Sequence, residues 1–150
     1  SSYFVFFYGL FDKNPSSINK KYLVKEIKKL GNCYFQEKNY DVNLTEIFFN
    51  KHVFVLPSHR EGLPKTALEA MQNNKALLLS DIPGHKYLIG KKKVNGIYFK
   101  KKNYRDLSNK IIWMIKNKKI VKRLMKNSIL NLLKFETNKI NKRFYETIEQ

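Results

Sequence analysis

The sequence predicts an α/β fold in which helices flank a Rossmann-like parallel sheet, with residues 1–150 forming one domain. Short apolar runs alternate along the chain with amphipathic segments, the order expected of a parallel sheet covered by helices. Clusters of Pro, Gly, Asn and Asp separate these segments, and no internal repeat or low-complexity linker interrupts them. With 43% hydrophobic and 14% aromatic residues, the composition is that of a globular protein.

The first half of the chain predicts strands and helices in turn. Apolar runs predict strands at residues 3–8, 33–36 and 52–56. Amphipathic segments between and after them predict helices at residues 18–30, 44–50 and 64–74. Gly31 is expected to cap the first helix, and Pro64 is placed in a first helical turn, where its missing N–H costs nothing.

The second half of the chain predicts two further strands and a helical C-terminal end. The strands cover residues 76–80 and 97–99, and Asp81-Ile82-Pro83-Gly84 is interpreted as the turn that ends the first of them. The predicted helices cover residues 104–116, 119–134 and 137–149. Because ligands bind at the carboxyl ends of parallel strands, the loops after Tyr8, Gln36, Leu56 and Ser80 should converge on one crevice.

The net charge of +18 is unevenly distributed, at +4 over residues 1–75 and +14 over residues 76–150. This asymmetry favours an anionic partner, namely nucleic acid, an acidic membrane surface or a phosphorylated substrate. However, 26 Lys against 4 Arg, together with 16 Asn, is also what an AT-rich coding bias produces. The scarcity of Arg argues against a nucleic-acid reader. Lys91–Lys93 and Lys100–Lys102 are interpreted as solvated turns, with contact to anionic lipid as the alternative.

Other sequence features bound the location of the protein. No run approaches the ~20 apolar residues that span a bilayer, and the opening residues lack the basic region of a signal peptide. Cys33 stands alone and is interpreted as a buried, inert thiol in a reducing compartment. We therefore expect a cytoplasmic protein.

Residues 56–71 form the most informative stretch. An apolar strand ends at Leu56, a loop with Glu61 and Gly62 follows, and a helix that carries Glu69 begins at about Pro64. The first turn of a helix has backbone N–H groups with no internal partner, so a glycine loop before it predicts an anion site. Two carboxylates eight residues apart flank that site. This arrangement suits a phosphate joined to a group rich in hydroxyls.

These residues resemble the signature of a known family. Residues 57–71, Pro-Ser-His-Arg-Glu-Gly-Leu-Pro-Lys-Thr-Ala-Leu-Glu-Ala-Met, resemble the Glu-x7-Glu motif of family 4 retaining glycosyltransferases. Ser80-Asp81-Ile82-Pro83-Gly84 and Asn95-Gly96-Ile97 follow at the family's spacing, and the resemblance extends from about residue 3 to residue 145. Asn14-Pro15-Ser16-Ser17-Ile18 resembles a subgroup that acts on polyprenol-linked or surface glycans.

The resemblance implies a GT-B architecture of two Rossmann-like domains, of which this chain is similar to the C-terminal, nucleotide-sugar-binding one. The N-terminal acceptor domain has no counterpart among these residues, so we expect it in cis or on a partner chain. By position, Glu61 would contact the donor sugar as the catalytic residue, and Glu69 would bind the ribose. Gly62, Leu63 and Pro64 would bind the donor, with the amides of Gly62 and Leu63 on the diphosphate.

Arg60 and Gly9 complete the implied donor site, which needs no metal or other cofactor. The sequence departs from the family pattern where Leu10 follows Gly9 and where Pro15 replaces a phosphate-binding Lys; Lys13 or Arg60 could substitute. His85, beside the crevice, is left open between a structural role and contact with substrate.

The implied reaction is transfer of a hexose or N-acetylhexosamine from a nucleotide diphosphate sugar, UDP-linked, to a glycan or lipid-linked acceptor in cell-surface polysaccharide synthesis. It would take place in the cytoplasm at the inner face of the membrane. Two alternatives stay open at this point. One is a non-catalytic module that binds nucleotide sugars, and the other is a basic nucleic-acid-binding protein.

Overall fold

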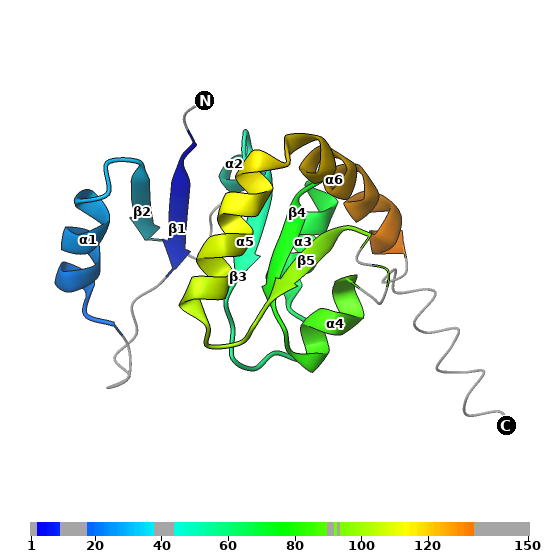
Figure 1. Ribbon diagram of the computed structural model, residues 1–150, viewed down its shortest axis with the longest axis horizontal. Helices are drawn as coiled ribbons and strands as arrows, with labels where there is room; N and C mark the ends of the chain where they lie inside the picture. The colour runs from blue at the N-terminus through cyan, green and yellow to red at the C-terminus, as the bar shows by residue number, and fades with distance from the viewer. Residues whose placement is uncertain (1–2, 10–17, 38–43, 90–91, 93, 134–150) are drawn as a thin grey trace, which may run out of the picture. The chain divides into compact units, whose positions relative to one another are not determined.

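The computed structural model describes residues 3–9, 18–37, 44–89, 92 and 94–133 of the chain (Figure 1). The chain divides into two compact units, Ser1–Asn43 and Leu44–Gln150. Both contain parallel strands alternating with helices, so the α/β class with parallel, helix-flanked sheets is confirmed. The predicted helix at residues 137–149 and the segment 10–17 lie outside the described residues.

The first unit is a β–α–β arrangement. Strands β1 (Val5–Gly9) and β2 (Cys33–Glu37) pair in parallel, with Val5 opposite Cys33 and Gly9 opposite Glu37. Helix α1 (Lys20–Lys28) joins them, and the Asn19 side chain caps its start by accepting a hydrogen bond from the Tyr22 amide. Gly31 follows the helix with φ of +66°, as its predicted capping role requires. Cys33 is half-buried, not fully buried as expected.

The second unit contains a three-stranded parallel sheet in the order β3-β4-β5. Its elements, in chain order, are α2 (Leu44–Phe48), β3 (Val53–Leu56), α3 (Lys65–Gln72), β4 (Ala76–Ser80), α4 (Pro83–Ile89), β5 (Gly96–Phe99), α5 (Tyr104–Lys116) and α6 (Lys118–Leu132).

Strand β4 is the centre of this unit, and all five of its residues are buried. Leu77 and Leu79 face one hydrophobic cluster, which is completed by residues of α2, α3 and α4. Ala76 and Leu78 face a second cluster, to which α5 and α6 contribute Met114, Val121 and Leu124. A parallel strand covered on both faces reads as a continuous apolar run, which explains the sequence Ala-Leu-Leu-Leu.

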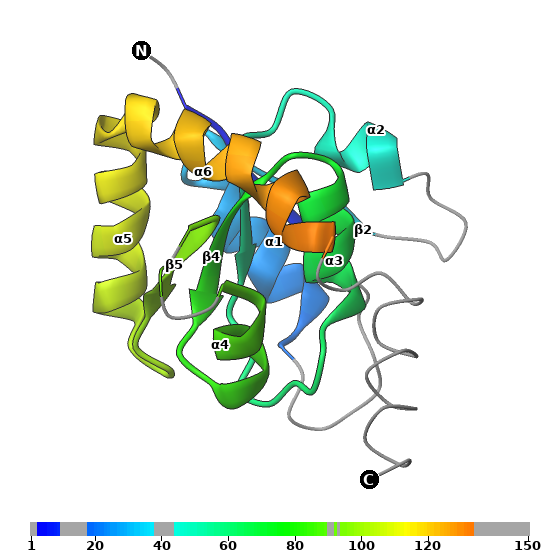
Figure 2. The same cartoon turned by 90° about the vertical axis from the view of Figure 1, so that its right-hand side faces the viewer.

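Helix α6 lies against α3 and β4 (Figure 2), and buried polar residues fix it there. The Ser128 hydroxyl donates to the Lys75 carbonyl at 2.6 Å, just before β4. The Asn131 amide donates to the Leu88 carbonyl at 2.7 Å, at the end of α4. Backbone carbonyls buried at element ends thus gain partners that the sheet and helices themselves do not supply.

The structure corrects two sequence predictions. The segment interpreted as the turn Asp81–Gly84 contains the start of α4, because Pro83 occupies a first helical position that tolerates proline. Pro64 does not lie in the first turn of its helix but caps it in an extended conformation, so α3 begins at Lys65. In the part of the chain that the structure describes, every helix is too short or too polar to cross a bilayer.

Candidate functional site

The site lies at the carboxyl edge of the sheet in the second unit. Strands β3, β4 and β5 end there at Leu56, Ser80 and Phe99. The Ser80 hydroxyl donates to the Ser58 carbonyl at 2.5 Å, which joins the segments that follow β3 and β4. The segments that follow Leu56 and Ser80 therefore meet as predicted, whereas the loops after Tyr8 and Gln36 lie outside the described residues, and the common crevice stays a prediction.

The backbone of Gly84 contacts the backbone of the Glu61–Gly62 segment. A Cβ atom added at Gly84 would lie 1.8 Å from the Gly62 carbonyl oxygen and 2.5 Å from that of Glu61. No side chain fits at such distances, so only glycine permits this approach. Helix α4, absent from the sequence prediction, thus supports the loop that carries Glu61.

The Glu61 side chain is half-buried and is held in place by one neighbour. The Ser58 hydroxyl donates to Glu61 Oε1 at 2.9 Å. A carboxylate accepts about four hydrogen bonds, so Glu61 keeps acceptor capacity for a ligand. Glu61 is thus an oriented acceptor at the sheet edge.

Helix α3 begins directly after this loop. Its first turn is closed by the Pro64 carbonyl, which accepts from the Ala67 and Leu68 amides at 3.1 and 3.3 Å. Pro64 is buried and Leu63 is exposed, so the helix start borders solvent. The N-terminal turn leaves backbone N–H groups for an anion. Glu69 lies farther along α3 and is half-buried.

The structure leaves two predicted donor residues without a defined role. Arg60 is exposed in the Glu61 loop. Gly9 ends β1 in the first unit, whose position relative to the second is not determined. Their assignment to the donor site stays a prediction, as does that of Lys13, which lies outside the described residues.

Next to the site, an exposed ion pair and a tyrosine connect α4 with β5. Lys86 Nζ lies 2.8 Å from Asp81 Oδ1, and the Tyr98 hydroxyl donates to the Lys86 carbonyl at 3.2 Å. Burial, together with the negative charge of Asp81, raises the pKa of Tyr98 to about 12.

Ser58 and Ser80 lie in the motifs quoted from the sequence, but the sequence assigned neither a role, and it left His85 unassigned. His85 is fully buried in α4, and its Nδ1 lies 2.8 Å from the Ser80 carbonyl oxygen and 3.1 Å from the Ser80 hydroxyl. A serine that ends a buried apolar strand is the only signal that could have pointed to this contact. His85 is therefore connected to the loop that carries Glu61 through its hydrogen bonds to Ser80.

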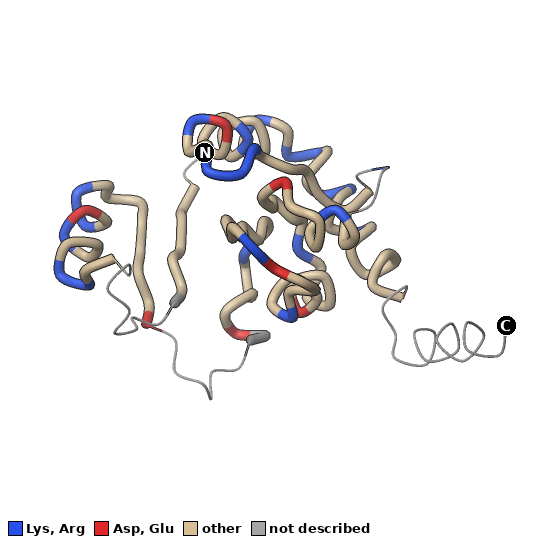
Figure 3. Tube along the Cα trace, turned by 90° about the horizontal axis from the view of Figure 1, so that it is seen from below, with Lys and Arg blue, Asp and Glu red and all other residues tan. Residues whose placement is uncertain are grey.

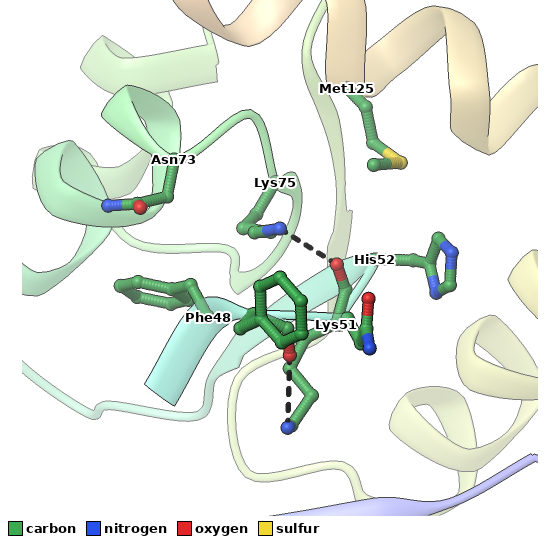
Figure 4. A pocket seen from close by; sticks show the side chains of 8 residues that line it. Phe48, Lys51, His52, Asn73, Lys75 and Met125 are labelled. Carbon is green, nitrogen blue, oxygen red and sulfur yellow. Dashed lines mark hydrogen bonds between the residues drawn. The ribbon is translucent and has the colours of Figure 1, made fainter. Parts of the chain in front are cut away.

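A separate pocket of about 320 Å³ lies at the opposite, amino end of β3 (Figure 4). Lys75 is buried beside it and donates to the Lys51 carbonyl at 2.9 Å. Burial, and to a lesser extent the charge of Lys51, lowers the pKa of Lys75. The pocket is lined by Phe48, Phe49, Asn50, Lys51, His52, Asn73, Lys75 and Met125. His52, which starts the predicted strand at residues 52–56, is exposed there and precedes β3.

A parallel sheet with an oriented carboxylate and a helix start at its carboxyl edge defines an α/β domain whose candidate ligand site lies where this class usually binds ligands. Residues 2–130 match the family described as glycosyl transferases group 1. The chain belongs to this family, which confirms the resemblance to glycosyltransferases, whereas the assignment to the retaining family 4 stays a prediction.

One similar protein agrees with this assignment, and two solved structures share the fold. The chain is 31% identical over 139 residues to N,N'-diacetylbacillosaminyl-diphospho-undecaprenol alpha-1,3-N-acetylgalactosaminyltransferase of Campylobacter jejuni, a match that covers 93% of this chain and 35% of the relative. The fold is similar to that of Anabaena HepE in complex with UDP, with a TM-score of 0.76 and 20% identity over 97% of this chain and 40% of HepE. The C-terminal domain of LpcC from Francisella tularensis is similar with a TM-score of 0.65 and 23% identity, over 78% of this chain and 61% of that one.

Proposed function

We propose that this chain is the donor-binding part of a retaining family 4 glycosyltransferase. It transfers a hexose or N-acetylhexosamine from a UDP-linked donor to a glycan or lipid-linked acceptor in cell-surface polysaccharide synthesis. The observation that carries the proposal is the oriented Glu61 carboxylate beside the start of α3, the helix that carries Glu69.

Each part of the site has a role that suits its chemistry. Glu61 accepts hydrogen bonds from hydroxyls of the donor sugar, and Glu69 accepts them from the ribose. The amides of Gly62 and Leu63, before the start of α3, hold the diphosphate. Charge that develops on the leaving phosphate is stabilised by these fixed N–H donors.

The names of similar proteins support the choice of donor and acceptor. The Campylobacter relative is named for N-acetylgalactosamine transfer to a diphospho-undecaprenol-linked sugar, and HepE has been crystallised with UDP and with UDP-glucose. This chain spans 35% of the first protein and 40% of the second. This partial coverage supports our proposal that the acceptor domain belongs to another part of the enzyme, in cis or on a partner chain. We further propose that the enzyme works in the cytoplasm at the inner membrane face.

Calorimetric titration with UDP, UDP-glucose, UDP-N-acetylglucosamine and UDP-N-acetylgalactosamine tests the donor site. We expect Glu69→Ala to weaken UDP binding at least ~10-fold, because it removes charge-assisted hydrogen bonds. Glu61→Ala should keep UDP affinity but lose the gain in affinity that the sugar provides. Glu46→Ala, an exposed acid on α2, is the matched control. Unchanged UDP binding by Glu69→Ala would show that the site is wrongly assigned.

A transfer assay separates the enzyme from the alternatives. Protein that includes the acceptor domain should transfer sugar to a polyprenol-linked acceptor, and Glu61→Ala should abolish transfer. Donor binding without transfer would favour a non-catalytic module. Binding to nucleic acid that falls steeply with salt, with no affinity for UDP, would favour the nucleic-acid alternative.

A further inference from the structure

The hydrogen bonds around His85 fix the position of its proton. Nδ1 lies 2.8 Å from the Ser80 carbonyl oxygen, which can only accept, so Nδ1 carries the proton. In the neutral ring Nε2 is then an acceptor. Nε2 is buried, and no hydrogen-bond partner for it occurs in the described part of the chain.

Three further contacts have a defined direction as well. The Ser80 hydroxyl donates to the Ser58 carbonyl at 2.5 Å, so its oxygen is free to accept from His85 Nδ1 at 3.1 Å. The Ser58 hydroxyl in turn donates to Glu61 Oε1 at 2.9 Å. His85, Ser80 and Ser58, which we call the relay, thus connect a fully buried ring to the carboxylate of the candidate site.

We propose that His85 is a positioning residue that sets the Glu61 carboxylate through the relay. The inference rests on the proposed donor role of Glu61. Two contacts constrain the loop at residues 58–62. Gly84 packs against the carbonyls of Glu61 and Gly62. The adjacent His85 holds Ser80, whose hydroxyl is hydrogen-bonded to the Ser58 carbonyl. Glu61 is therefore oriented for the donor sugar before the ligand arrives, which lowers the cost of ordering on binding.

A purely packing role would not need a histidine. Leucine has a comparable volume and would fill the space without a buried nitrogen that lacks a partner, a feature that is uncommon in folded proteins. What leucine cannot supply is the donor at Nδ1. A donor at that position is therefore the property to be tested.

The test uses protein that includes the acceptor domain, with UDP and the most tightly bound UDP-sugar of the panel above as probes. His85→Leu should weaken UDP-sugar binding about fivefold to tenfold, the loss expected for a hydrogen-bonded contact, and leave UDP binding unchanged. His85→Asn, which can place an amide N–H near the Nδ1 position, should restore most of the affinity, whereas His85→Gln should not. His52→Leu, the same substitution at an exposed histidine on the opposite end of β3, is the control.

A double-mutant cycle with Glu61→Ala tests whether His85 affects UDP-sugar binding through Glu61. In the Glu61→Ala background His85→Leu should cause no further loss, because the relay has nothing left to orient. Additive losses, or equal losses for UDP and UDP-sugar, would overturn the inference while leaving the donor site in place. If Glu61→Ala itself binds the UDP-sugar normally, the proposed function fails, and the inference with it.

A spectroscopic measurement applies even if His85→Leu does not fold. Nitrogen NMR of the unsubstituted protein should show a proton on Nδ1 of His85, and Ser80→Ala should shift the Nδ1 resonance. A neutral ring protonated at Nε2 would contradict the relay.

Discussion

At the residue scale, the candidate site depends on the close contact between the backbone of α4 and that of the Glu61 loop, as well as on its carboxylates. Gly84 and Gly62 lie on the two sides of this backbone contact, yet the space around their Cα atoms differs. A Cβ at Gly84 would collide with two carbonyl oxygens, whereas a Cβ at Gly62 would meet no atom within 4 Å. The two glycines therefore allow a matched comparison.

We expect Gly84→Ala to lower the free energy of unfolding by about 1–3 kcal/mol, the usual cost of overpacking, because backbone atoms cannot give way as a side chain does. Gly62→Ala should leave thermal stability almost unchanged. Thermal unfolding followed by circular dichroism measures both. Equal melting temperatures for the two variants would show that α4 does not press against the Glu61 loop.

The raised pKa of Tyr98 predicts a loss of stability at high pH. Tyrosine has a pKa near 10 in an unfolded chain and about 12 here. Between these values the unfolded state releases a proton that the folded state keeps, so this contribution to stability, complete below pH 10, is lost as the pH rises toward 12. Chemical unfolding at pH 9 and pH 11 should show a smaller decrease for Tyr98→Phe than for the unsubstituted protein. An identical decrease would mean that Tyr98 ionises normally.

At the scale of the elements, periodicity explains why most of the fold could be predicted. The run Ala76–Ser80 has no polar interruption until its end, and α5 shows an amphipathic pattern bounded by an Asn103 cap. Helix α4 was missed because it is short and begins with Pro-Gly, a pair that also marks turns. The local sequence cannot distinguish a turn from a helix start at this position. The contact of Gly84 with the Glu61 loop favours the helix.

The candidate site could be predicted only in part for a related reason. Glu61, Gly62 and Glu69 lie in one continuous segment, so their spacing on a strand, loop and helix start carries the information. Ser80 meets Ser58 across 22 residues of sequence, and that contact depends on the pairing of β3 with β4. No rule based on local residue spacing predicts a contact between residues so far apart in the sequence. The relay can therefore be recognised only in the folded structure.

The buried hydroxyl of α6 gives a prediction at this scale. Ser128→Ala removes the donor to the Lys75 carbonyl, and an unsatisfied buried acceptor costs about 1–3 kcal/mol of stability. Ser108→Ala, the same change at an exposed position of α5, should cost less than about 0.5 kcal/mol. Urea unfolding of both variants provides the comparison. A Ser128→Ala variant as stable as Ser108→Ala would show that α6 is held by its apolar face alone.

At the scale of the whole molecule, the distribution of charge bears on which surface could contact an anionic membrane. Lys and Arg occur in both units (Figure 3), but their surroundings differ. Helix α1 contains Glu26, which pairs with Lys29. By contrast, no acidic residue occurs between Asp106 and Glu136, a stretch with eight basic residues that includes α6. We therefore propose the exposed face of α6 as a further candidate for contact with anionic lipid, beside Lys91–Lys93 and Lys100–Lys102, for which such contact stays a prediction.

We expect the protein to bind vesicles of phosphatidylglycerol, and not vesicles of phosphatidylcholine, with an affinity that falls as salt screens the charges. Each Lys near an anionic surface contributes about 1 kcal/mol, so replacing Lys119, Lys122 and Lys126 of α6 by Gln should lower the binding constant at least ~10-fold. The matched triple substitution of Lys21, Lys25 and Lys28 on α1 changes the net charge equally and should have a smaller effect. Vesicle sedimentation measures both, and equal losses would mean that the total charge, not the α6 surface, governs binding.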